Sequence, residues 1–285
     1  MIERRPVADF FSHAIMLVSI AIVVFPIYLA VVAASHTLQD VMQAPMPLLP
    51  GDLLFHNLAA ALFNGPENVM AGGSSPALML MVNSIIMSLA IAIGKIAISL
   101  LSAFAIVYFR FPLRMFFFWM IFITLMLPVE VRILPTYKIV ADLGMLDSYG
   151  GLVLPLIASA TATFFFRQFF MTVPDEMIEA ARIDGAGPLR FLWDILIPLS
   201  RTNIAALFVI LFIYGWNQYL WPLMVSTDVR YQTIVLALGR MMLAPEAAYE
   251  WPIIMSTAVL ALLPPILVVV LMQRWFVKGL VETEK

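Results

Sequence analysis

The chain has 285 residues, 63% of them hydrophobic and only 12% charged, and its mean hydropathy is +0.99. These values lie outside the range of soluble domains and indicate an integral membrane protein, long enough for several spans but not for a large extramembrane domain. The net charge of −2 decides little, whereas the absence of cysteine excludes disulfides, thiolate metal sites and a cysteine nucleophile. We therefore expect contact with membrane lipid and no nucleic-acid partner.

Apolar runs recur along the chain at about the length that a membrane-spanning helix needs, roughly 20 residues. The predicted spans are Ala14 to Ala34, Ala77 to Phe109, Met115 to Val129, Gly150 to Phe166, Ile204 to Val225 and Ile253 to Met272. The sequence thus predicts an all-α polytopic membrane protein with about six transmembrane helices. We expect one transmembrane domain over residues 1–285, with an outer loop at about 35–76 and a cytoplasmic loop at about 171–202.

The distribution of lysine and arginine predicts the orientation, because positively charged loops are retained on the cytoplasmic side. With Met1 inside, the cytoplasmic cations outnumber the outer ones, so both termini are predicted to be cytoplasmic. The cytoplasmic set is Arg4, Arg5, Arg110, Arg114, Arg167, Arg182, Arg190, Arg201, Arg274, Lys278 and Lys285, and the outer set is Arg132, Lys138, Arg230 and Arg240.

The most polar stretch between two predicted spans is EMIEAARIDGAG, residues Glu176 to Gly187. Pro174 and the acids after it predict a helix start, since proline suits the first turn and acids suit the positive N-terminal end. Gly185 predicts the helix end, because glycine accepts a left-handed turn. A helix of this length is too short and too polar to cross a membrane, and by its charge alone it would be a solvated surface helix.

The pattern Glu179-Ala180-Ala181, Asp184-Gly185-Ala186 and Ile197-Pro198 resembles the cytoplasmic "EAA" loop of the membrane subunits of bacterial ATP-binding-cassette importers. The similarity to the carbohydrate-type branch continues from the second predicted span to the C-terminus. One departure is Thr202, where many sugar-type members have a second proline. The resemblance implies the type I importer permease fold in the bacterial inner membrane. Taken whole, the chain resembles permeases that import sn-glycerol 3-phosphate, which implies that substrate and related glycerophosphodiesters.

In this family the EAA helix docks on a cytoplasmic ATPase and couples ATP binding to alternating access. The resemblance therefore implies that Glu179, Ala180, Ala181, Asp184 and Gly185 form the ATPase-coupling contact. It also implies three kinds of partner, namely an ATPase dimer, a second homologous permease and an extracytoplasmic substrate-binding protein. The chain has no G-x-x-x-x-G-K-[ST] phosphate loop, so we expect no catalytic residue, no metal and no cofactor in it, with ATP and magnesium used by the partner ATPase.

Lys95 lies near the middle of the second predicted span, where a charge is costly and usually faces protein or a water-filled path. It is a candidate for the substrate pathway, because a cation there would offset the charge of a phosphate ester. The alternative is a structural role, pairing with a neighbouring helix or snorkelling outward. Asn217, near the outer end of the fifth predicted span, is a second pathway candidate. Glu130 and Arg132 form an outer gate or mark the water boundary.

Three other functions remain open from the residues. A permease for a neutral sugar is the alternative within the importer class. A secondary transporter would usually show several intramembrane acids for ion coupling, whereas Lys95 is the one charge well inside a predicted span. A membrane enzyme would need clustered nucleophiles, bases or ligands, and the histidines His13, His36 and His56 are scattered.

Overall fold

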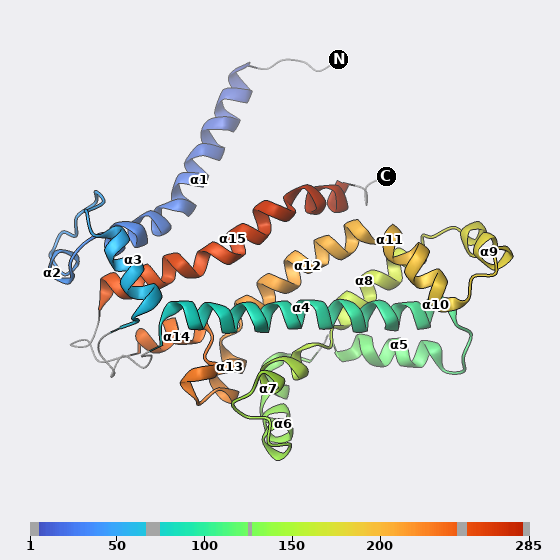
Figure 1. The fold of residues 1–285 in the computed structure, drawn as a ribbon. Coiled ribbons are helices and arrows are strands. Elements are labelled where there is room, and N and C mark those ends of the chain that lie inside the picture. The colour runs from blue at the N-terminus through green and yellow to red at the C-terminus, as the bar shows by residue number, and fades with distance from the viewer. Residues whose placement is uncertain (1–5, 67–74, 125–126, 244–249, 282–285) are drawn as a thin grey trace. The chain divides into compact units, whose positions relative to one another are not determined.

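The computed structural model describes residues 6–66, 75–124, 127–243 and 250–281, and in this part of the chain every regular element is helical (Figure 1). The α-helices are α1 (Pro6–Ala34), α2 (Leu38–Val41), α3 (Leu54–Phe63), α4 (Ala77–Tyr108), α5 (Arg114–Ile123), α6 (Val129–Asp142), α7 (Tyr149–Val153), α8 (Ala160–Phe170), α9 (Asp175–Ile183), α10 (Pro188–Phe191), α11 (Ile197–Leu199), α12 (Arg201–Trp216), α13 (Leu220–Val225), α14 (Ile234–Met241) and α15 (Trp251–Val281). Short 3₁₀ turns cover Leu154–Leu156 and Val229–Tyr231, and a π-helix covers Leu192–Leu196. The all-α prediction is confirmed for the described residues.

Three helices in the described residues are long and apolar enough to cross a membrane, and up to five spans result if each bent pair counts as one. The three are Phe10–Ala34, Ala77–Tyr108 and Trp251–Arg274. The pairs are Tyr149–Leu156 with Ala160–Phe170, bent by 48°, and Pro188–Leu199 with Arg201–Trp216, bent by 74°.

The predicted third and fifth spans differ from the helices observed. The third coincides with α5, which has only 10 residues and ends at Ile123, two residues before positions outside the described range. In the fifth, α12 ends at Trp216 and a separate helix, α13, begins at Leu220. A helix of 16 residues rises about 24 Å, less than the hydrocarbon thickness of about 30 Å, so α12 needs the preceding segment to complete a span.

The chain groups into two compact units by proximity of its Cα atoms. Unit 1 comprises Met1–Met79 and Ala237–Leu263, and unit 2 comprises Leu80–Leu236 and Pro264–Lys285. The division falls within the continuous helices α4, α14 and α15. The prediction of one domain over the whole chain stays a prediction.

In unit 1, hydrogen bonds fasten the end of α1 to the segment that follows it. Asn57 of α3 donates through Nδ2 to the carbonyl oxygens of Ala34 and His36, at 2.8 and 3.0 Å. Ser35 accepts a hydrogen bond from the backbone N–H of Gly51 at 2.7 Å. Since a buried carbonyl without a partner is costly, Asn57 stabilises the helix end that it caps.

In unit 2, small and polar side chains form one face of α4. Ser84, Ser88, Ile91, Lys95 and Ser99 repeat every three or four residues, the spacing of one helix face, and each is at most 6% exposed. These side chains therefore face protein. The small serines also permit close approach of other helices, as is typical of helix packing in membranes.

Helix α12 makes such an approach at Gly215. A Cβ added to Gly215 would lie 2.8 Å from the Cα of Ser88, a backbone atom that cannot move aside easily. Glycine is therefore required at this crossing of α12 and α4.

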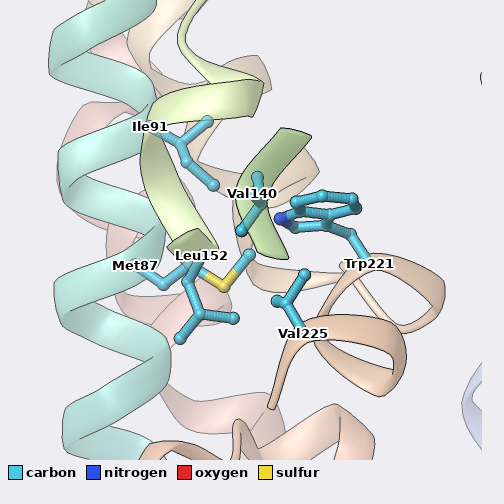
Figure 2. Close-up of a cluster of buried hydrophobic side chains, with 6 residues drawn as sticks. All are labelled: Met87, Ile91, Val140, Leu152, Trp221 and Val225. Atoms are coloured by element: carbon cyan, nitrogen blue, oxygen red, sulfur yellow. The ribbon is translucent and has the colours of Figure 1, made fainter. Parts of the chain in front are cut away.

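An apolar cluster joins α4 to the segments α6, α7 and α13 of unit 2 (Figure 2). Its buried members are Met87, Ile91, Val140, Leu152, Trp221 and Val225. The indole N–H of Trp221 donates to the carbonyl oxygen of Gly151 at 3.1 Å, which satisfies the polar end of this side chain. The cluster thus fixes α13 against α7 by both packing and a directional bond.

Asn83 is a buried polar anchor next to this cluster. Its Nδ2 donates to the carbonyl oxygens of Arg230 and Gln232, and its Oδ1 accepts from the hydroxyl of Tyr149 at 2.6 Å. Ser84 Oγ accepts from the backbone N–H of Ile234 at 2.8 Å. Two adjacent side chains of α4 therefore hold the segment that connects α13 to α14.

Asp147 fastens the loop between α6 and α7 to the end of α13. Its carboxylate accepts three hydrogen bonds, from the backbone N–H groups of Thr227 and Asp228 and from the Thr227 hydroxyl, at 2.6 to 2.7 Å. The backbone N–H of Asp147 donates to Val225 at 2.9 Å. The bond from the Asp228 N–H, followed by that from the Thr227 hydroxyl, lowers the pKa of Asp147 because both favour the ionised carboxylate.

We expect Asp147→Ala to destabilise the purified protein at pH 7 by about 1 kcal/mol or less, since solvent screens these bonds. Because the folded pKa is lowered, the contribution is complete above the unfolded pKa of about 3.9 and is lost as pH falls below it. The thermal unfolding midpoint of wild type and variant, measured from pH 7 to pH 3.5, checks both points. Asp142→Ala is the matched control, because Asp142 ends α6 without a side-chain bond to any described residue; an equal loss in both variants would contradict the prediction.

Candidate functional site

The polar stretch of residues 176–187 folds as predicted around α9. Pro174 is the residue before the first helical turn, Asp175 and Glu176 lie in that turn, and Arg182 lies in the last. Acids at the start and a base at the end complement the helix dipole. These local signals fix where α9 begins and ends, and the burial of Ala181 packs the helix against the rest of unit 2.

A glycine closes α9 in the left-handed conformation. Gly185 has φ +72°, its N–H donates to Arg182 O, and the N–H of Ala186 donates to Ala181 O at 2.9 Å. This is the hydrogen-bond pattern of a Schellman motif, which satisfies the last carbonyls of a helix. Gly185 is needed for its backbone conformation, because nothing lies within 4 Å of an added Cβ.

The structure divides the five predicted coupling residues by exposure. Glu179, Ala180, Asp184 and Gly185 are exposed, whereas Ala181 is buried at 4%. Glu179 and Ala181 line a cavity of about 660 Å³ together with α4 residues such as Tyr108. Ala181 therefore packs within unit 2, and the exposed surface of the motif is provided by the other four.

The sequence analysis did not identify Ile183, an apolar residue at the end of α9. Ile183 is 85% exposed, although isoleucine usually avoids water. It belongs to the same exposed surface as Asp184. The composition of the EAA pattern gives no signal for it, because the pattern specifies only its neighbours.

Lys95 is the second predicted site residue, and its side chain is buried in unit 2. The residue is 6% exposed, and its Nζ lies 3.7 Å from the centroid of the Tyr214 ring of α12. This is a cation–π contact. Among the described residues the ammonium has no hydrogen-bond or salt-bridge partner.

Lys95 also lines a cavity of about 120 Å³ in unit 2. The cavity includes a second cation, Arg132 of α6, and no described residue that lines it is acidic. Its other lining residues are Ile133, Thr136, Pro155, Leu156, Ala158, Tyr214, Gln218, Leu220 and Trp221. The structure thus places Arg132 in the same cavity as Lys95, whereas the sequence suggested Arg132 only as a gate or boundary residue.

Asn217 does not line this cavity. It is exposed at the end of α12, where its N–H donates to Ile213 O at 3.0 Å. The neighbouring Gln218 lines the cavity, and its Nε2 donates to Tyr214 O at 3.1 Å. The sequence could not assign the orientation of these two side chains, because both follow the end of α12 at Trp216.

Comparison with known proteins identifies the class of this fold. The crystal structure of a bacterial ABC transporter involved in the import of the acidic polysaccharide alginate contains a chain that matches with a TM-score of 0.77 at 20% identity. The match covers 97% of this chain and 99% of that one. This chain therefore has the fold of a chain of that ABC importer.

Residues 95–282 match the family described as binding-protein-dependent transport system inner membrane component, and the chain belongs to this family. Curated relatives agree over the full length. The sn-glycerol-3-phosphate transport system permease proteins UgpE of Brucella melitensis and Agrobacterium fabrum are each 62% identical over 285 residues, and that of Pectobacterium atrosepticum is 57% identical. Each alignment covers 100% of both chains. The chain is a multi-pass inner-membrane transport subunit.

We expect Gly185→Ala to loosen the end of α9, because an L-residue in the left-handed conformation costs about 1–2 kcal/mol. Gly187→Ala is the matched control, since Gly187 has a negative φ of −69° and equally open surroundings. Hydrogen exchange in peptides covering α9 should become roughly 5- to 30-fold faster in Gly185→Ala alone. Equal exchange in the two variants would show that the closing turn does not depend on glycine.

Proposed function

We propose that this chain is a permease subunit of an ATP-driven importer that carries sn-glycerol 3-phosphate, and related glycerophosphodiesters, across the bacterial inner membrane by alternating access. The observation that supports this substrate is the 62% identity, over the whole of both chains, to permeases named for sn-glycerol 3-phosphate transport. The family and the importer fold support the transport class independently of the substrate.

The proposed complex contains an ATPase dimer, a second related permease and an extracytoplasmic substrate-binding protein. The family description, which names binding-protein-dependent transport, supports the last of these. The sequence has no phosphate loop of its own, which supports ATP and magnesium being used by the partner ATPase. This chain is then a transport subunit without catalytic residues.

Helix α9 is the proposed contact with the ATPase. Glu179, Ala180, Asp184 and Gly185 offer an exposed surface with a charge, a small side chain and a fixed turn, and Ile183 adds an apolar side chain to it. Ala181 has a different role, because its burial packs α9 against the rest of unit 2. A displacement of α9 by the ATPase would therefore be transmitted to unit 2.

The transport prediction is tested with the complete complex reconstituted in vesicles with ATP. We expect uptake of labelled sn-glycerol 3-phosphate that an excess of a neutral disaccharide does not reduce. Uptake should fall at least tenfold in Gly185→Pro, because proline cannot adopt φ +72° and lacks the N–H that Arg182 O accepts.

The Gly187→Ala variant should transport like wild type. Uptake of the disaccharide in place of the phosphate ester would establish the neutral-sugar alternative. Normal uptake by Gly185→Pro, at equal amounts of assembled complex, would contradict coupling through α9.

The orientation is proposed with α9 and both termini in the cytoplasm, on the distribution of lysine and arginine. The chain has no cysteine, so single cysteines are specific probes. Leu189→Cys and Leu49→Cys place thiols at residues 67% and 77% exposed, and neither belongs to the proposed ATPase contact. In intact cells a membrane-impermeant maleimide should label the variant at 49 at least tenfold faster than the variant at 189, and the order should reverse in inside-out vesicles. The opposite order would invert the proposed topology.

A further inference from the structure

The cavity that contains Lys95 has the properties of an anion-binding site. Lys95 belongs to the buried face of α4 and is only 6% exposed. Taking an ammonium out of water costs several kcal/mol unless it is compensated, and an aromatic face contributes about 2 kcal/mol. The Tyr214 ring is the one partner that Lys95 has among the described residues. The remaining compensation must therefore come from water or an anion in the cavity that Lys95 lines.

The second cation increases this cost. Arg132 lines the same cavity, and no described lining residue is acidic. Arg132 is itself exposed, so water screens part of the repulsion, but two like charges that line one small cavity still repel each other. An anion from solution would compensate both.

The donors and walls of the cavity match a phosphate group. Lys95 has three N–H donors, and the planar fork of Arg132 can bind two phosphate oxygens at once. Thr136 cannot donate inward, because its hydroxyl donates to Arg132 O at 2.7 Å, and the indole N–H of Trp221 is bonded to Gly151 O. The two cations are thus the principal donors, on a wall formed by aromatic and aliphatic side chains.

The size of the cavity agrees with a small anionic group. A volume of about 120 Å³ accessible to water-sized spheres holds several waters, since one water needs roughly 10–15 Å³ by this measure. A phosphate group replaces a few waters. The cavity is smaller than the 300–1,000 Å³ typical of sites that enclose a whole organic ligand.

We propose that this cavity is a transient site for the phosphate of the transported ester, in which Lys95 and Arg132 bind the phosphate oxygens. The proposal rests on the proposed function for the identity of the ester. It assigns to this subunit a part in selecting anionic over neutral substrates. A transport site must bind weakly enough to release its ligand, which fits a site with two cations and few further donors.

The first test compares two substrates in the reconstituted complex. A phosphomonoester such as sn-glycerol 3-phosphate carries up to two negative charges, whereas a glycerophosphodiester carries one. Lys95→Met and Arg132→Gln should each reduce monoester uptake roughly tenfold and diester uptake roughly threefold or less, so that the ratio of the two rates falls. A purely structural role for Lys95 would reduce both rates equally and leave the ratio unchanged, which would overturn the proposal.

Lys138→Met is the matched control. Lys138 is an exposed cation of α6, the helix that carries Arg132, and it does not line the cavity. Its substitution should leave the ratio of monoester to diester uptake as in wild type. A ratio lowered equally by Lys138→Met would show that the general charge of α6, and not the cavity, selects the anion.

The second test measures anion binding without transport. Purified complex is treated with an amine-reactive reagent, and modification of Lys95 is followed by mass spectrometry with inorganic phosphate or sn-glycerol 3-phosphate present. Either anion should slow modification at Lys95 at least threefold in wild type and not in Arg132→Gln. Modification unaffected by either anion overturns the site. Protection by both anions, in a complex that does not transport the ester, would uphold the site while the proposed function fails.

Discussion

The hydrocarbon core of a membrane offers no hydrogen bonds, so a polar side chain at that depth must find its partner inside the protein. Helix α4 satisfies this constraint because its polar side chains lie on one face, and this face is buried within unit 2. Asn83 and Ser84 hold the segment before α14, and Ser88 receives the close approach of Gly215. The positions of α7, α12 and α13 in this unit therefore follow from the partners that α4 needs.

Lys95 is the member of this face that the same constraint leaves incompletely satisfied. Asn83, Ser84 and Ser99 form hydrogen bonds to backbone groups of the protein, whereas the ammonium of Lys95 contacts one aromatic ring. The same spacing of three or four residues that buries the serines of α4 thus also places Lys95 at a cavity. Helix α9 has the opposite character, since its terminal charges and glycine turn define its ends while most of its side chains, Ala181 excepted, stay exposed or half-exposed. A buried charge and an exposed helix are the two features that packing alone does not explain.

The sequence was sufficient to predict whatever depends on local chemistry. Membrane spans α1, α4 and α15 and the bounds of α9, from Pro174 to Gly185, follow from apolar runs, helix ends and a glycine, and the structure confirms them. The predicted fifth span continued through Asn217 because the segments 204–216 and 219–225 are both mainly apolar, yet the chain breaks there into α12 and α13. That Lys95 and Arg132 line the same cavity could not be predicted, since it depends on how α4 and α6 pack. The burial of Ala181 beside an exposed Ala180 was equally hidden in a motif that treats the two alanines alike.

The π-helix of residues 192–196 determines more than the shape of the segment between α10 and α12. A π turn contains one residue more than an α turn closes, so removing a residue there would restore a regular helix. The same deletion would rotate the chain that follows by about 100° about the axis of residues 188–199, since each residue of an α-helix turns by that angle. Because α12 is bent by 74° from the preceding segment, this rotation would swing α12 in another direction, and Gly215 would no longer meet Ser88. The extra residue thus sets the direction in which α12 leaves the bend.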